Sequence, residues 1–134
     1  MTRYITCISG KGGVGKTSST INLGAAFTYF GKDTTIVDAN LTTPNIGIHL
    51  GAPIVPINLN HVLQGKNHIS EAVYLHPGGT KIVPASISIN DLKNTDPKNL
   101  RRVLRGLYGT TDIVVIDSAA GLGREAMLAL EAGD

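Results

Sequence analysis

One segment, residues 10–17 with the sequence GKGGVGKT, restricts the fold of this chain more than any other feature. It fits the pattern G-x-x-x-x-G-K-[ST], in which glycines let successive backbone N–H groups point at phosphate oxygens that a Cβ would obstruct. A strand-forming run at residues 4–8 precedes it, and a helical pattern begins at Lys16. This order of strand, glycine loop and helix predicts a phosphate-binding loop within an α/β fold.

Each polar residue of the loop has an expected task. Lys16 is expected to reach the β- and γ-phosphates of a nucleotide, and the Thr17 hydroxyl to bind Mg²⁺. The helix that follows adds the positive end of its dipole. The predicted nucleotide contacts are Gly10, Lys11, Gly12, Gly13, Val14, Gly15, Lys16, Thr17, Ser18 and Gly121.

Strands alternate with helices along the rest of the chain. Residues 34–37 form a strand pattern that ends in Asp38, residues 81–83 form another, and the apolar run 113–116 ends in Asp117. The pattern predicts a parallel α/β sheet with right-handed crossovers and helices on both faces. Because ligands bind beyond the carboxyl ends of such strands, Gly10, Asp38 and Asp117 are expected to meet in one site.

Four helices are predicted between and after these strands. The first begins at Lys16 and is expected to bury Leu23, Ala26, Phe27 and Phe30, and a short one spans residues 59–64 before Gly65. A third begins with Asp96 as N-cap and Pro97, and buries Leu100, Val103, Leu104 and Leu107. The last starts near Arg124 and carries Met127, Leu128 and Leu130.

The metal site is expected to include Thr17, Asp38 and Asp117. Asp117 is the natural second magnesium anchor, usually through water, and Asp38 is expected to support the magnesium shell. The small residues at 118–123 suit a segment that moves as the γ-phosphate comes and goes.

Composition and charge alone make no case for nucleic acid or a membrane as a partner, and they leave the partners open. The net charge of +2 is small, and the cations Lys98, Arg101, Arg102 and Arg105 are read as the solvated face of a helix rather than a nucleic-acid stripe. Cys7 is the only cysteine, which excludes an internal disulfide and points to the cytoplasm. No apolar run approaches the about 20 residues that span a bilayer. The four histidines lack zinc-site pairing, and no metal is assigned to them.

Residues 11–17 resemble the deviant Walker A motif of the MinD/ParA family of P-loop ATPases, which carries an extra lysine early in the loop, here Lys11. The resemblance covers essentially the whole chain and is closest to MinD-like members. It continues through residues 37–40, 45–47, 61–65, 83–86 and 115–121.

This resemblance implies a P-loop NTPase fold, ATP and Mg²⁺ as cofactors, and ATP hydrolysis in the spatial regulation of cell division or intracellular positioning. It also implies a homodimer formed on ATP, in which Lys11 reaches the partner's phosphates, together with a protein activator. DNA is not indicated. Family members are about twice as long, so residues 1–134 are expected to be the N-terminal part of a single ATPase domain. The later strands and a C-terminal helix for peripheral membrane association are expected to be absent.

The main departure from the family pattern follows the second strand. Members typically carry two carboxylates spaced as D-x-D, whereas this chain has Asp38 and Asn40. The expected catalytic residues are Lys11, Lys16, Asp38 and Asn40, with slow turnover because an amide positions water but cannot take its proton. A non-hydrolysing nucleotide-binding switch, a ParA-like DNA-partition ATPase and a small-molecule kinase stay open. The related iron–sulfur reductases are excluded because Cys7 is the only thiol.

Overall fold

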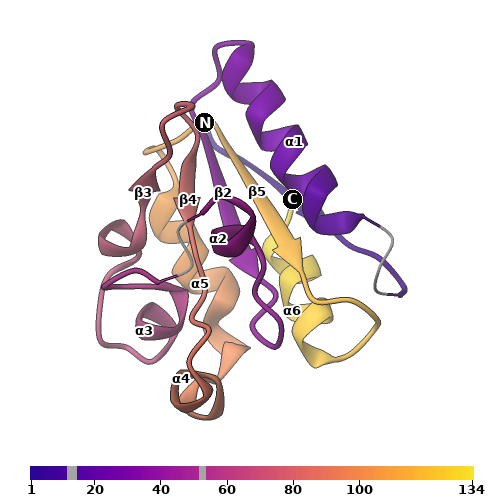
Figure 1. Ribbon diagram of the computed structural model, residues 1–134, viewed down its shortest axis with the longest axis vertical. Helices are drawn as coiled ribbons and strands as arrows, with labels where there is room; N and C mark the ends of the chain where they lie inside the picture. The colour runs from indigo at the N-terminus through magenta and orange to yellow at the C-terminus, as the bar shows by residue number, and fades with distance from the viewer. Residues whose placement is uncertain (12–14, 52–53) are drawn as a thin grey trace.

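A mostly parallel, five-stranded sheet forms the centre of the computed structural model, which describes residues 1–11, 15–51 and 54–134 (Figure 1). Its strand order is β1-β5-β2-β4-β3. Four strands run parallel, and the short β3 pairs antiparallel with β4, a pairing that the sequence did not predict. The strands are β1 (Arg3–Cys7), β2 (Thr34–Ala39), β3 (Tyr74–Leu75), β4 (Lys81–Val83) and β5 (Ile113–Ser118).

Helices cover both faces of this sheet, as predicted. The α-helices are α1 (Lys16–Tyr29), α2 (Ile46–His49), α3 (Leu59–Leu63), α4 (Ile89–Asn94), α5 (Leu100–Leu104) and α6 (Arg124–Ala132), and three 3₁₀ turns are η1 (Ile69–Ala72), η2 (Pro97–Asn99) and η3 (Arg105–Leu107). One face carries the first two helices, and the other carries helices that follow them in the chain, α3, α5 and α6 (Figure 1).

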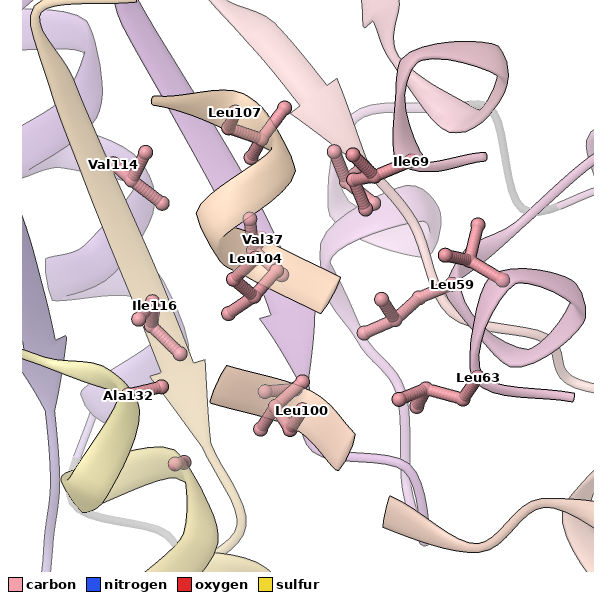
Figure 2. Packing of buried hydrophobic residues seen from close by; sticks show 14 of the residues in the cluster. Val37, Leu59, Leu63, Ile69, Leu100, Leu104, Leu107, Val114, Ile116 and Ala132 are labelled. Carbon is pink, nitrogen blue, oxygen red and sulfur yellow. The ribbon is translucent and has the colours of Figure 1, made fainter. Parts of the chain in front are cut away.

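Alternation along the strands divides the core between the two faces. Val37 of β2 joins Val114 and Ile116 of β5 in the larger cluster, against α3, α5 and α6 (Figure 2). Its neighbour Ile36 points to the opposite face and packs with Ile46 of α2. Residues of β2 and β5 are buried throughout because both strands are covered on both sides. The two strands are therefore rigid supports for the loops that follow them.

The buried face of α1 differs from the prediction. Thr20 and Gly24 are its buried residues, whereas Ala26 is exposed and Phe30 is 78% exposed. A Cβ on Gly24 would lie 2.5 Å from Cδ1 of Ile36, so the helix lies against β2 through its smallest residue. Apolar spacing predicted the helix correctly but placed its contact face wrongly, because a glycine carries no apolar signal.

The same reason applies to α6. Its buried residues are Ala126, Ala129 and Ala132, while Met127 and Leu130 remain 48% and 45% exposed. Small side chains let this helix lie close to the sheet, and the larger ones that suggested it point outward.

Strand β1 is also less buried than predicted. It spans Arg3–Cys7 rather than residues 4–8, and Ile8 is 51% exposed. The strand pairs with β5 on one side and forms the edge of the sheet, so only Tyr4 is fully buried within it.

The segment that contains η2, α5 and η3 begins as predicted. The Asp96 carboxylate accepts a hydrogen bond from the Lys98 N–H at 3.0 Å, and Leu100, Leu104 and Leu107 are buried. Arg105 stacks over the ring of Tyr4 at 4.1 Å, which turns this cation toward the protein. No helix among the described residues has both the length and the apolar character that a membrane crossing requires.

Candidate functional site

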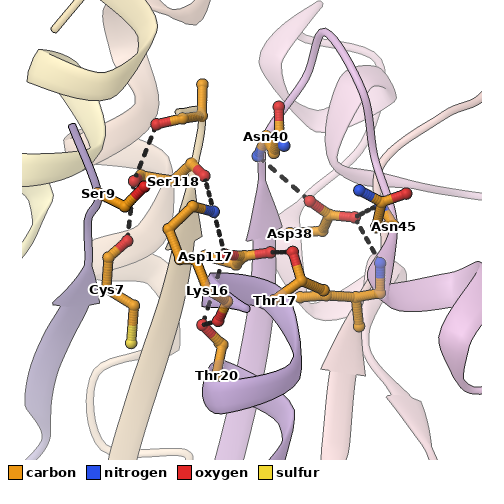
Figure 3. Close-up of polar contacts among 12 residues, drawn as sticks. Cys7, Ser9, Lys16, Thr17, Thr20, Asp38, Asn40, Asn45, Asp117 and Ser118 are labelled. Atoms are coloured by element: carbon orange, nitrogen blue, oxygen red, sulfur yellow. Dashed lines mark hydrogen bonds and ion pairs between the residues drawn. The ribbon is translucent and has the colours of Figure 1, made fainter. Parts of the chain in front are cut away.

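Three parallel strands end at the same edge of the sheet and bring the predicted residues together. In the register of the sheet, Asp117 of β5 lies opposite Cys7 of β1 on one side and Asp38 of β2 on the other. β1 also ends at this edge, and Lys16 and Thr17 at the start of α1 lie beside Asp117 (Figure 3). Asp38 and Asp117 are therefore neighbours at this edge, while the meeting of Gly10 with them stays a prediction.

Asp117 is the centre of a buried polar cluster. Its Oδ1 accepts a hydrogen bond from Nζ of Lys16 at 2.5 Å, and its Oδ2 accepts one from the Thr17 hydroxyl at 2.8 Å. Nζ of Lys16 also donates to the Ser118 carbonyl. The Asp117 side chain is fully buried and that of Lys16 is 9% exposed. An ion pair withdrawn from water in this way needs several hydrogen bonds to be stable, and the cluster supplies them.

The N-terminus of α1, with its first backbone N–H donors, lies beside this cluster, because Lys16 and Thr17 both bind Asp117. Gly15, at the N-cap, has φ 85°, a left-handed conformation that favours glycine. None of the described side chains caps this end, and no acidic residue lies in the first turn. The positive end of the helix dipole is left for a bound anion.

A pocket of about 270 Å³ opens in front of these donors. Its walls come from the glycine loop, from α1 and from the segment after β2. Gly10 and Gly121 are not among the described residues that line it, although both were predicted to contact the nucleotide, and Gly12, Gly13 and Val14 lie outside the described residues. The lining residues are Ser9, Lys11, Gly15, Lys16, Thr17, Ser18, Asn40, Thr43, Asn45, His49 and Ala120.

The donor set suits a magnesium nucleotide. Backbone N–H groups and the Lys16 ammonium fit phosphate oxygens, and the oxygens of Thr17 and Asp117 are ligands that Mg²⁺ prefers. Within residues 1–11, 15–51 and 54–134, no three His, Cys, Asp or Glu side chains lie close enough to hold a metal together. Mg²⁺ fits such a sparse set because it keeps waters and takes phosphate oxygens as ligands.

Asp38 has its carboxylate bound to backbone groups. Its Oδ2 accepts hydrogen bonds from the N–H groups of Asn45 at 3.0 Å and Ile46 at 3.1 Å, and its Oδ1 accepts one from Asn40 at 3.2 Å. Burial, together with the nearby charge of Asp117, raises the pKa of Asp38 to about 7 despite the lowering effect of these N–H donors. Asp38 thus fixes the loop between β2 and α2, and its support of the magnesium shell stays a prediction.

Asn40 lies at the edge of the pocket with 7% of its surface exposed. Its Oδ1 accepts hydrogen bonds at 3.3 Å from both the N–H and the hydroxyl of Thr43. Because the oxygen is the acceptor in these contacts, the other polar group of the side chain is the amide nitrogen, which is a donor. Asn40 therefore offers hydrogen-bond donors where a second carboxylate would offer acceptors.

The segment after β5 is tied to the start of the glycine loop. The Ser118 hydroxyl donates to the Cys7 carbonyl at 2.8 Å, and the Gly121 N–H donates to the Ser9 carbonyl at 2.9 Å. Gly121 has φ 87°, so it serves this turn through its backbone. Ala120 rather than Gly121 reaches the pocket.

Sequence reasoning did not single out several residues of the site. Thr20, whose hydroxyl lies 3.4 Å from Oδ1 of Asp117, is one helical turn after Lys16, so helical spacing contained its signal. Glu125 binds the loop after β2 from α6, and His49 lines the pocket from α2. Their positions depend on tertiary packing, for which a single sequence holds no local signal.

Known proteins resemble this chain in both sequence and fold. A family model described as an AAA domain matches residues 2–134. An uncharacterized ATP-binding protein of Methanocaldococcus jannaschii is 36% identical over 130 residues, which are 97% of this chain and 49% of that protein. The septum site-determining protein MinD of Thermotoga maritima is 33% identical over 127 residues, which are 92% of this chain and 46% of that protein. The chain spans about half the length of the curated relatives it matches.

A solved structure agrees with these relatives. The septum site-determining protein MinD from Pyrococcus horikoshii OT3, complexed with Mg-ADP, has a TM-score of 0.95 and 37% identity to this chain. The match covers 99% of this chain and 55% of that one. Magnesium and an adenine nucleotide, the cofactors expected from the sequence, are those bound in this relative. The chain belongs to the MinD/ParA family of P-loop ATPases.

Proposed function

We propose that this chain binds ATP with Mg²⁺ in the pocket at the N-terminus of α1 and hydrolyses ATP as a MinD-like switch. The observation that carries this proposal is the cluster in which Asp117 holds Lys16 and Thr17 beside that pocket. Family membership supports the assignment. Residues 1–134 are, in this proposal, the N-terminal part of a single ATPase domain.

Each residue of the cluster has one role in the proposed reaction. When bound, ATP would supply the phosphoryl group that is transferred to water, and Mg²⁺ would neutralise phosphate charge. Lys16 would place its cation beside the phosphates, and Thr17 and Asp117 would hold Mg²⁺. The backbone donors of α1 add positive potential at no cost in reorganisation.

The switch is proposed to act as a homodimer that forms on ATP. Lys11 is exposed at the rim of the pocket, where a lysine can face a second copy of the chain. A cation supplied in trans stabilises the charge that develops during phosphoryl transfer. Release of the dimer after hydrolysis would make the protein a timer for cell division or intracellular positioning, set by a protein activator and, in a full-length form, by peripheral membrane association.

Asn40 favours slow hydrolysis, and it is also the residue that supports the alternative function, a nucleotide sensor that does not hydrolyse ATP. Its amide nitrogen can orient a water molecule or a phosphate oxygen, but it cannot accept a proton. Phosphoryl transfer depends mostly on positioning and electrostatics, so turnover is expected to be slow rather than absent. A non-hydrolysing nucleotide sensor is the second candidate, and turnover measurements separate the two.

A DNA-partition role has less support from the surface. Arg105 is turned toward Tyr4 and lies 3.9 Å from Asp134, and Arg124 pairs with Asp96 at 3.1 Å. Arg101 and Arg102 remain exposed on α5. With Arg105 engaged in these contacts, the exposed cations that remain on α5 fit the solvated face expected from the sequence better than a nucleic-acid stripe.

ATP binding and turnover of the full chain test the proposal, with Lys16→Ala, Lys11→Ala and Asn40→Asp as variants. We expect Lys16→Ala to weaken ATP binding by about 30-fold or more, since a charged hydrogen bond contributes about 2 kcal/mol or more. Lys11→Ala should retain binding but lose the ATP-dependent dimer, measured by light scattering. Asn40→Asp should raise the turnover rate. Undiminished ATP affinity in Lys16→Ala would refute the site, and zero turnover in both wild type and Asn40→Asp would favour the non-hydrolysing sensor.

A further inference from the structure

Two loops flank the nucleotide pocket, and one side chain of α6 joins them. The pairing of β2 with β5 ends at Ala39 and Ser118, after which residues 40–45 and residues 119–123 diverge. Glu125, the second residue of α6, reaches from the end of one loop to the other. Its Oε1 accepts a hydrogen bond from the Leu41 N–H at 2.6 Å, and its Oε2 accepts one from the Thr42 hydroxyl at 2.5 Å.

The Glu125 carboxylate is well placed to hold a backbone position. It lies in the first turn of α6, where the helix dipole favours negative charge. Hydrogen bonds to a carboxylate are shorter and stronger than those between neutral groups. Leu41 is 4% exposed and packs in the larger core cluster, so its backbone is fixed from both sides, by packing and by Glu125.

The hydrogen bonds of Glu125 to Leu41 and Thr42, called the Glu125 bridge below, cross an open space between the two loops. A hollow of about 450 Å³ separates them, with Asn40, Thr42 and Thr43 on one side and Ala119, Ala120 and Gly123 on the other. The hydrogen bonds of Glu125, which also lines this hollow, connect the two loops beside it. Asn40 and Ala120 also line the nucleotide pocket, so the bridge lies directly behind the site.

We propose that Glu125 is a positioning residue that holds Asn40 through Leu41 and Thr42 and makes residues 40–43 move together with residues 119–123. A shift of the segment after β5 then reaches the side chain of Asn40 through the Glu125 carboxylate. This inference rests on the proposed function, in which Asn40 orients the groups that react.

Amide hydrogen exchange tests the bridge without any nucleotide. In the full chain, we expect Glu125→Ala to raise the exchange rate of the Leu41 amide by about 10-fold or more, because its acceptor is lost. The matched control is Glu131→Ala, which removes the same charge from an exposed position of the same helix and should leave that rate unchanged. Circular dichroism shows whether each variant is folded. An unchanged Leu41 amide in folded Glu125→Ala would overturn the proposal, whether or not the chain hydrolyses ATP.

Turnover then tests the positioning of Asn40. Glu125→Ala is expected to lower kcat by about 10-fold with KM for ATP changed less than about twofold, because small misplacements cost rate while Lys16 and Thr17 still bind. Glu125→Gln keeps an acceptor for Leu41 and can donate to Thr42, so it should restore most of kcat. Equal losses in Glu125→Gln and Glu125→Ala, or a kcat of Glu125→Ala equal to wild type, would overturn the positioning role. Absence of turnover in wild type would instead overturn the proposed hydrolysis, while the exchange experiment still decides the bridge.

Discussion

The ion pair between Lys16 and Asp117 can be measured as a coupling energy in the absence of nucleotide. Nζ of Lys16 lies 2.5 Å from Oδ1 of Asp117, and the side chains are 9% and 0% exposed. Removing one partner leaves a charge buried without its counter-charge, which costs about 3–5 kcal/mol in such pairs. Lys16 also donates to the Ser118 carbonyl and borders an open pocket, so the lower end of that range applies.

We therefore expect Lys16→Met and Asp117→Asn each to lower the free energy of unfolding by about 3 kcal/mol. The double variant should lose about 3 kcal/mol as well, since the second substitution removes the charge that the first left unpaired. The resulting coupling energy is about 3 kcal/mol. Urea unfolding followed by far-ultraviolet circular dichroism measures it, because the chain has no tryptophan to report by fluorescence.

Two controls complete this experiment. Thr17→Val removes the hydroxyl that donates to Oδ2 of Asp117 without changing charge, and should cost only about 1 kcal/mol. Saturating ATP with Mg²⁺ should stabilise the wild type by about 2.7 kcal/mol at a hundred times Kd, and the Lys16→Met variant by no more than about 0.9 kcal/mol at the same ATP concentration. A double variant whose loss equals the sum of the two single losses would refute the argument, because it would mean that the two charges do not stabilise each other.

Three further outcomes follow from other contacts. Asp38, with its pKa raised from 3.8 to about 7, keeps a proton in the folded state that the unfolded chain releases, so the free energy of unfolding should fall by up to about 4 kcal/mol as pH rises from 4 to 7; urea unfolding of Asp38→Asn across this range should show a flatter profile. Gly24→Ala should destabilise the fold by about 1–2 kcal/mol, since the added Cβ would lie 2.5 Å from Ile36, and a stabilised variant in thermal unfolding would contradict this. Tyr4→Phe should cost about 1–2 kcal/mol in the same assay, because it removes the hydrogen bond at 2.8 Å to the Leu104 carbonyl; an unchanged unfolding temperature would count against it.

The sequence was most informative where a local pattern determines the structure. The apolar run at residues 113–116 predicted a strand buried on both faces, and the glycine loop predicted the strand and helix on either side of it. Asp117 could be placed in the site because it follows that run directly. These features depend on a few neighbouring residues, so one sequence was enough to find them.

Features that depend on distant residues were missed or misplaced. Glu125 lies 84 positions from Leu41, and neither residue shows locally that the two will meet. Gly24 is buried against β2 because it is small. A prediction from the spacing of apolar residues instead chose larger side chains such as Phe30, which is exposed. The contacts of Asp38 with the backbone of Asn45 and Ile46 were also not predicted, since they arise only once α2 is formed, while its place at the metal stays a prediction.

The strand order β1-β5-β2 determines when the site can exist during synthesis. β1 and β2 are made first but are not neighbours, since β5, which ends at Ser118, lies between them. A ribosome that adds about 5–20 residues per second takes about 4–16 s to pass from the end of β2 to the end of β5. During that time the glycine loop and α1 exist on the nascent chain without Asp117, and the first strand has no parallel partner. Nucleotide therefore cannot guide the early steps of folding. It can bind only chains in which β5 has already been inserted between β1 and β2.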